Sequence, residues 1–508
     1  IESHGRGIGG KRGELSMKSI AMKLSLVKSS FVKSSWQPTK LVVALALGTS
    51  LALSGCASTT ASKRVDTGSF AMPSYDKLVL DNGLTVYLMP QREVPLITLN
   101  AVVRAGAVND TTAGIAQMTA QGLLLGAAGK SKAEIEQQVD FLGASLGAEA
   151  DKEGSYLAAD FMAKDTDVML GLFSAALLSP DFDSAEFDKL KQRAIAGLQQ
   201  DKESPRAVIG RYFDKLVFGA HPYGNASSGN RESLEQVTVS QLRAFHKSYY
   251  QPANTALTVV GDFDVAAMKA KLTQTFGQWK GSEKLAQPDL NQGLPTLTEA
   301  KVLLVDKPDA METTFVIGGL GISRDNPDYV GLTVVNTILG GRFTSWLNDE
   351  LRVNAGLTYG ARSGFSPYTD SGVFTISTFT KTETTQQAID LALKTYARLW
   401  EKGVDQATLD SAKAYVKGQF PPKFETSGQL AGLLSGMYLY GFDDKFINEF
   451  QAKVDGLTLE ETQRLVKTYF PQKDLQFVLI GSASKIAPIA AKYGQVQTVD
   501  INAVGFGQ

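Results

Sequence analysis

Apolar and polar positions along most of the chain follow two periods, and their order predicts strands followed by helices. Residues 79–88 form a predicted β-hairpin, because apolar residues flank an Asn-Gly turn signal. Residues 96–103 are a further apolar run of strand length, whereas residues 187–200 and 384–400 fit long amphipathic helices. We therefore expect sheets that are covered by helices.

The closing part of this pattern occurs twice. Thr238 begins a helix with a capping box, and the helix is followed by an aromatic pair, a proline and the apolar strand 256–260. Thr458 begins a second helix of the same kind, and the same order leads to the strand 475–480. The spacing agrees between the two halves, which indicates an internal repeat. Residues 301–305 and 313–320 are the corresponding opening strands of the second copy.

We predict an α+β fold with two homologous domains, each a mostly antiparallel sheet covered by helices. The first domain is expected at residues 76–283 and the second at residues 299–508. Residues 284–298 contain two prolines and few periodic apolar positions, so they are interpreted as a linker.

The first part of the chain has a different composition. A basic stretch reaches Lys40, and a short apolar run then leads to Leu-Ser-Gly-Cys, which ends at Cys56. This order predicts a secretory signal peptide, since the run is too short to span a bilayer. The ending resembles a bacterial lipobox, in which Cys56 would carry the lipid; an ordinary signal peptide with an incidental cysteine is the alternative. We assign residues 1–56 to upstream sequence and signal peptide, and residues 57–75 to a tether, and we expect an outer-membrane lipoprotein that faces the periplasm.

Composition argues against one class of partner and excludes one kind of covalent link. The formal net charge of the 508 residues is −1, so no basic excess indicates nucleic acid as a partner. Cys56 is the single cysteine, so no intrachain disulfide is possible.

Several strings resemble the pitrilysin/insulinase family of zinc peptidases. Residues 218–224 and 245–252 resemble it in the first half. In the second half the resemblance runs through residues 339–347 and continues to Arg352 and Tyr359. It covers nearly everything after residue 77, and it implies a two-domain zinc-peptidase scaffold.

The resemblance also locates a helix that lacks its chemistry. Active members carry His-x-x-Glu-His, with two zinc ligands one turn apart and a general base between them. Here the corresponding positions are Gln117, Ala120 and Gln121, and the position of the family's third ligand, a Glu, aligns with Gly197. An amide is a poor zinc ligand and cannot accept a proton from water. We therefore expect no cofactor in this chain and zinc in a partner subunit.

Two residues of the second half keep the family's pattern. The resemblance implies that Arg352 and Tyr359 reach into a peptidase cleft, where a guanidinium and a phenol stabilise negative charge on the substrate carbonyl oxygen. Neither residue activates water, so both need a zinc-bearing chain. The structural alternative is that Arg352 pairs with Asp349 or Glu350 and that Tyr359 caps a core strand.

These observations lead to a first hypothesis: a non-catalytic subunit of a heteromeric zinc metallopeptidase that binds and helps cleave peptides in the periplasm. A homologous subunit would bring zinc and the base, and the peptide would lie as an added strand on a sheet edge. The alternative is a peptide-binding or scaffold lipoprotein of the cell envelope without peptidase activity. A self-sufficient enzyme that uses Glu149, Asp201 or Glu203 is a third possibility. His221 and His246 are expected to pack in the core.

Overall fold

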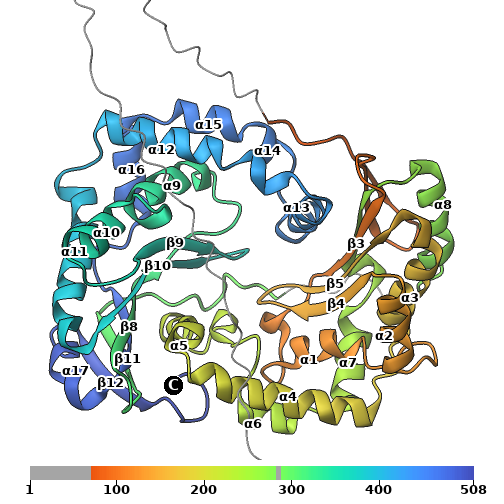
Figure 1. Ribbon diagram of the computed structural model, residues 1–508, viewed down its shortest axis with the longest axis horizontal. Coiled ribbons are helices and arrows are strands. Elements are labelled where there is room, and N and C mark those ends of the chain that lie inside the picture. Colours follow the sequence, from red (N-terminus) through yellow and green to blue (C-terminus); the bar gives the residue numbers. More distant parts are fainter. Residues whose placement is uncertain (1–69, 282–287, 508) are drawn as a thin grey trace, which may run out of the picture. The chain divides into compact units, whose positions relative to one another are not determined.

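The structure is a computed structural model that describes residues 70–281 and 288–507, all of which belong to one compact unit (Figure 1). The signal peptide, Cys56 and most of the tether lie outside these residues. No helix within the described residues is both long and apolar enough to cross a membrane. The bounds of the signal peptide, the tether, the linker and the two domains stay predictions.

The first sheet has six strands in the order β1-β2-β6-β3-β5-β4. Only β2 and β6 are parallel neighbours. The predicted hairpin is confirmed, because β1 and β2 pair antiparallel and Gly83 takes a positive φ of 89° at their turn. The strands are β1 (Asp76–Val79), β2 (Thr85–Pro90), β3 (Leu96–Val103), β4 (Ser145–Ala150), β5 (Ser155–Met162) and β6 (Thr255–Gly261).

The second sheet repeats this order as β12-β7-β11-β8-β10-β9. From β7 to β9 it matches β2 to β4 of the first sheet, which confirms the internal repeat. At the outer edge the halves differ: β12 comes from the end of the chain and pairs parallel with β7, where β1 formed a hairpin. The strands are β7 (Lys301–Asp306), β8 (Glu312–Leu320), β9 (Arg362–Pro367), β10 (Gly372–Lys381), β11 (Gln476–Gly481) and β12 (Gln495–Asp500).

Helices cover both sheets, as predicted. The capping boxes at Ser131 and Thr238 are formed, and the Thr458 hydroxyl accepts the Glu461 amide at 3.2 Å. The helices of the first half are α1 (Ile115–Gly122), α2 (Lys132–Phe141), α3 (Thr166–Leu178), α4 (Ser184–Lys202), α5 (Pro205–Phe218), α6 (Arg231–Gln236), α7 (Val239–Tyr249) and α8 (Val265–Phe276). Those of the second half are α9 (Tyr329–Asn336), α10 (Trp346–Asn348), α11 (Thr385–Glu401), α12 (Gln406–Gly418), α13 (Ser427–Tyr440), α14 (Lys445–Asn448), α15 (Phe450–Gly456), α16 (Leu459–Tyr469) and α17 (Ala483–Ala490).

One helix from each half of the chain packs on the sheet of the other half. Helix α13 of the second half packs on β3 and β6, and helix α5 of the first half packs on β8 and β11 (Figure 1). Leu434 of α13 is fully buried in the first of these contacts, and Phe213 of α5 is 1% exposed in the second. Because each sheet needs a helix from the other half to cover one face, the two halves share their cores.

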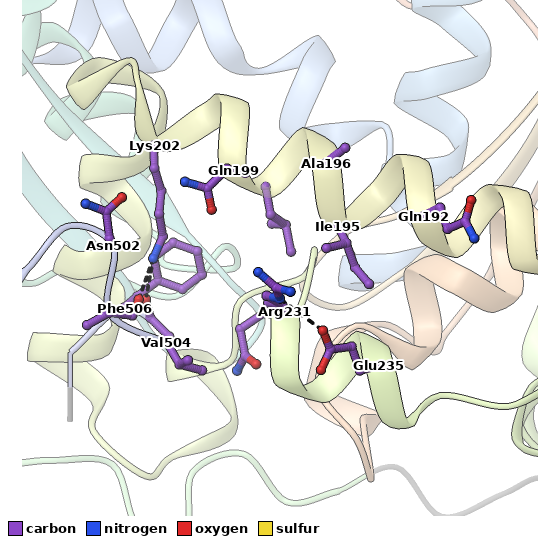
Figure 2. Close-up of a pocket in the computed structure, with 14 residues that line it drawn as sticks. Gln192, Ile195, Ala196, Gln199, Lys202, Arg231, Glu235, Asn502, Val504 and Phe506 are labelled. Carbon is purple, nitrogen blue, oxygen red and sulfur yellow. Dashed lines mark hydrogen bonds and ion pairs between the residues drawn. The ribbon is translucent and has the colours of Figure 1, made fainter. Parts of the chain in front are cut away.

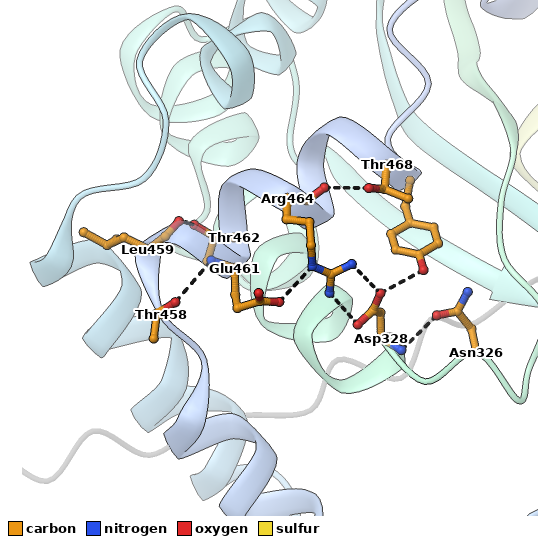
Figure 3. A network of polar contacts seen from close by, with 9 residues as sticks. Asn326, Asp328, Thr458, Leu459, Glu461, Thr462, Arg464 and Thr468 are labelled. Carbon is orange, nitrogen blue, oxygen red and sulfur yellow. Dashed lines mark hydrogen bonds and ion pairs between the residues drawn. The ribbon is translucent and has the colours of Figure 1, made fainter.

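A polar network joins α16 to the start of α9 (Figure 3). The Arg464 guanidinium donates two hydrogen bonds to the Asp328 carboxylate, at 2.7 and 2.9 Å, and a third to Glu461 at 2.9 Å. The Tyr469 hydroxyl also donates to Asp328, at 2.8 Å. Asp328 directly precedes α9, so the network ties the start of that helix to α16.

Candidate functional site

Helix α1 contains Gln117, Ala120 and Gln121, the positions that the sequence resemblance predicts as a degenerate zinc site. It begins after Gly114, whose φ is 91° and whose amide donates to the Asp110 carboxylate at 2.6 Å. The Ala116 amide donates to the other carboxylate oxygen at 3.0 Å. Burial raises the pKa of Asp110 to about 7, although these N–H groups favour the charged form. Asp110 therefore satisfies the first turn of α1 in place of an N-cap side chain.

The predicted zinc positions on α1 hold side chains that do not fit zinc. Gln117 and Gln121 are partly exposed one turn apart, and Ala120 between them is fully buried. The Gln117 carbonyl oxygen accepts the backbone N–H of Ala150 in β4, at 2.5 Å. Gly197 lies in α4, and a Cβ built on it would have no atom within 4 Å. Within the described residues no group of three His, Cys, Asp or Glu side chains is placed to hold a metal ion.

Both histidines of the domains take part in packing. His221 is buried; its Nε2 donates to the Leu290 carbonyl at 3.0 Å, and its Nδ1 accepts the Tyr223 amide at 3.2 Å. His246 donates to the Leu177 carbonyl at 2.9 Å, and burial lowers its pKa. Both ring nitrogens of His221 are thus engaged within the protein, and His246 is partly buried with its Nε2 on a backbone carbonyl, which agrees with the packing role expected for them.

The Arg/Tyr segment has an unusual backbone. Two π-helical turns, η5 (Thr337–Gly341) and η6 (Asp349–Asn354), stand on either side of α10. Gly340 permits the first of them, because a Cβ there would lie 2.3 Å from the backbone nitrogen of Ser363 in β9. Such turns inside helical segments often mark functional sites. Arg352 lies in η6.

Arg352 does not form the ion pair of the structural alternative. Its guanidinium lies 4.5 Å from the ring of Phe343, and no acidic side chain of the described residues forms an ion pair with it. Glu350 instead pairs with Arg398, at 3.2 Å. The Arg352 side chain is partly exposed, so its donors remain available to a ligand.

Tyr359 is presented to solvent on a short, anchored loop. It is 83% exposed, so it does not cap a core strand. The Thr378 hydroxyl lies 2.8 Å from the Gly360 carbonyl and 3.0 Å from the Thr358 hydroxyl, which ties both neighbours of Tyr359 to β10. The ring of Tyr359 makes no hydrogen bond or ring contact with Arg352. The structure thus leaves Arg352 partly exposed and Tyr359 exposed, without a direct contact between the two side chains.

The surroundings of Tyr359 contain a residue that the sequence did not indicate. The ring centroids of Tyr359 and Phe379, which lies in β10, are 6.5 Å apart. The residue in question is Arg206, whose guanidinium lies 3.7 Å from the ring centroid of Phe379. Arg206 belongs to α5, the helix of the first half that packs on the second sheet. No local motif marks it, because its position depends on that long-range packing.

Of the three carboxylates that a self-sufficient enzyme would use, two are held in ion pairs and the third is exposed. Asp201 pairs with Arg211 at 2.8 Å, Glu203 pairs with Lys307 at 3.1 Å, and Glu149 lies on the exposed face of β4. A cavity of about 730 Å³ lies between α4, α6 and residues 502–506. Figure 2 shows the side chains that line it. Its charged groups are already engaged: Lys202 donates to the Ala503 carbonyl at 2.6 Å, and the remaining pair is Arg231 and Glu235, at 2.9 Å.

Known proteins with similar sequences and folds are zinc proteases and their inactive relatives. Residues 89–229 match the family described as Insulinase (Peptidase family M16), and residues 236–416 match the Peptidase M16 inactive domain. The zinc protease PqqE of Helicobacter pylori is 24% identical over 80% of this chain and 92% of its own length. The non-peptidase homolog YmxG of the same organism is 24% identical over 73% of this chain and 85% of its own length.

A solved structure with a similar fold comes from the same family. The peptidase M16 inactive domain from Pseudomonas fluorescens superposes with a TM-score of 0.76 at 27% identity, and the match covers 80% of this chain and 98% of that one. The two family matches together span more than half of the chain, in the order of its two sheets. The chain therefore belongs to the insulinase family of peptidases, family M16.

Proposed function

We propose that this protein is a non-catalytic subunit of a heteromeric zinc metallopeptidase that binds and helps cleave peptides in the periplasm. One observation supports the proposal: the partly exposed Arg352 and the exposed Tyr359 are two donors of a chain whose predicted zinc positions hold Gln117, Ala120 and Gln121. Such a chain has groups for stabilising charge and none for activating water.

The division of labour follows from these residues. A homologous subunit supplies zinc and the general base. In this chain the Arg352 guanidinium and the Tyr359 hydroxyl donate hydrogen bonds to a substrate carbonyl oxygen, where negative charge develops during hydrolysis. The contact between Arg352 and Phe343 limits the rotamers of the arginine and so lowers the entropy lost on binding.

Relatives support a paired arrangement. In Helicobacter pylori one relative is named a zinc protease and another a non-peptidase homolog. Both resemble this chain along most of their length. A cell that makes both kinds of chain has the two parts that the proposal requires.

The proposed location in the cell is inferred from the first part of the chain. A lipid on Cys56 would hold the protein at the outer membrane on its periplasmic side, and residues 57–75 would give it reach. No nucleic acid is expected as a partner, because the chain has no basic excess.

The test is co-expression with the His-x-x-Glu-His homologue of the same organism. We expect no hydrolysis of a fluorogenic peptide by this chain alone and hydrolysis by the pair. In the pair, Arg352→Lys or Tyr359→Phe should lower kcat by about 100-fold or more, the usual effect of removing one donor to an oxyanion. Val353→Ala is the matched control, because Val353 is 66% exposed beside Arg352 and has no polar group.

Two outcomes would contradict the proposal. A pair that assembles but works equally well with both variants removes Arg352 and Tyr359 from the reaction. The absence of both assembly and activity favours the alternative, a peptide-binding or scaffold lipoprotein of the cell envelope.

A further inference from the structure

Strand β4 is an edge strand with an open outer side. It forms the end of the first sheet, and its exposed residues are Ser145, Gly147 and Glu149. Edge strands usually carry protection against added strands, such as lysine, proline or a bulge. β4 has neither lysine nor proline, and Glu149 is its only charge.

The register of β4 shows which backbone groups face outward. The Asp151 amide donates to the Gly154 carbonyl at 2.8 Å and closes the turn to β5. Hydrogen-bonded positions alternate along an antiparallel pair. The backbone groups of Leu146, Ala148 and Ala150 therefore point away from β5, toward the open side.

One of these outward groups is already taken. The N–H of Ala150 donates to the side-chain carbonyl of Gln117, at 2.5 Å. Gln117 stands on α1, which packs directly against β4. The outward groups of Leu146 and Ala148 make no hydrogen bond within the described part of the chain. The open stretch of the edge therefore ends at Ala150, where a side chain of the chain itself fills the next position.

We propose that Gln117 acts as a lock on this edge: it occupies the Ala150 N–H and restricts an added peptide strand to Leu146 and Ala148. This inference rests on the peptide-binding part of the proposed function, and it gives Gln117 a positive role. A peptide that extends past Ala148 has to displace the Gln117 amide, and the exchange of one hydrogen bond for another yields no net gain at that position.

The lock is tested first in the free chain, by amide hydrogen exchange at Ala150. Gln117→Met has a similar shape without an acceptor, and Gln117→Glu keeps an acceptor. We expect Ala150 to exchange about three- to tenfold faster in Gln117→Met than in the wild type, and Gln117→Glu to resemble the wild type. Gln121→Met, one turn further along α1, is the matched control and should leave Ala150 unchanged. Equal exchange in all four proteins overturns the lock.

The second measurement is binding of a short fluorescent peptide of alternating Val and Thr, followed by anisotropy. Gln117→Met should bind it about three- to tenfold more tightly than the wild type or Gln117→Glu, because one more backbone position becomes free. A peptide with alternate N-methylated amides should lose this gain. Thermal melting confirms that each variant is folded.

The two measurements separate the lock from the proposed function. If the peptide binds equally to all variants, the lock is wrong and peptide binding stands. If exchange at Ala150 responds but no variant binds the peptide, the edge is not a docking site, and both the restriction by Gln117 and the peptide-binding part of the proposed function are overturned.

Discussion

The carboxylate of Glu153 accepts the backbone N–H of Thr369, which lies 3.0 and 3.1 Å from its two oxygens. Glu153 stands in the turn between β4 and β5, and Thr369 stands in the turn between β9 and β10. The Tyr223 hydroxyl donates to the same carboxylate at 2.9 Å, and the neighbouring Lys152 pairs with Asp214 at 3.0 Å. Equivalent turns of the two sheets are thus joined by a buried polar contact.

Glu153 makes stability depend on pH. Burial raises its pKa, so the folded protein holds a proton at pH values where the unfolded chain has lost it. Its contribution to stability is therefore largest below the ordinary glutamate pKa and declines as pH rises through the raised value. We expect Glu153→Gln, which keeps an acceptor oxygen, to remove this decline. Urea unfolding across the acidic to neutral range measures it.

The companion variant, Glu153→Ala, leaves two donors unpaired. It should lower the free energy of unfolding by about 1–3 kcal/mol at neutral pH, the cost of a buried unsatisfied group. An unchanged pH slope in Glu153→Gln would assign the pH dependence to another group, with Asp214 the next to examine because burial also raises its pKa.

Helices α5 and α13, each of which packs on the sheet of the other half, should be essential for stability. Leu434 of α13 is fully buried in the cluster on the first sheet, so Leu434→Ala should cost about 2–5 kcal/mol in urea unfolding. Val168→Ala is the control, since Val168 is 49% exposed on α3, and it should change stability by less than about 0.5 kcal/mol. A similarly small effect of Leu434→Ala would show that α13 is dispensable for the first sheet.

The contact between Arg464 and Asp328 should stabilise the protein only above the pKa of the acid. The hydrogen bonds from Arg464 lower the pKa of Asp328, so this contribution is present above the ordinary aspartate value and is lost as pH falls through the lowered one. Both side chains are partly exposed, so Arg464→Gln should cost no more than about 1 kcal/mol at neutral pH. The difference from the wild type should vanish in acid; a difference that persists there would be due to packing.

Zinc binding should be recoverable by restoring ligands. Gln117→His with Gln121→His places two imidazoles one turn apart, and Gly197→Glu adds a third ligand at a position with open space around its Cβ. We expect the triple variant to retain stoichiometric zinc through gel filtration, and the double variant to lose it. Metal analysis by mass spectrometry distinguishes them. Equal retention by both variants would show that Gly197 does not correspond to the third ligand position.

The sequence alone predicted features that depend on neighbouring residues. The turn at Gly83, the caps at Thr238 and Thr458 and the repeat of strands and helices are local, because turn and cap geometry is set within a few residues. The loss of zinc ligands at Gln117 and Gln121 and of the base at Ala120 was likewise predicted from the sequence. So was the resemblance of the segment with Arg352 and Tyr359 to the family's pattern.

The tertiary structure alone decided how these pieces meet. Three contacts between different parts of the chain could not be read from the sequence. Helices α5 and α13 each pack on the sheet of the other half. Gln117 accepts the Ala150 amide, and Arg352 contacts Phe343 instead of pairing with Glu350. Periodicity indicates that a helix has an apolar face but not which sheet that face covers. Burial and hydrogen-bond partners across long separations in the chain are settled only when the whole core packs.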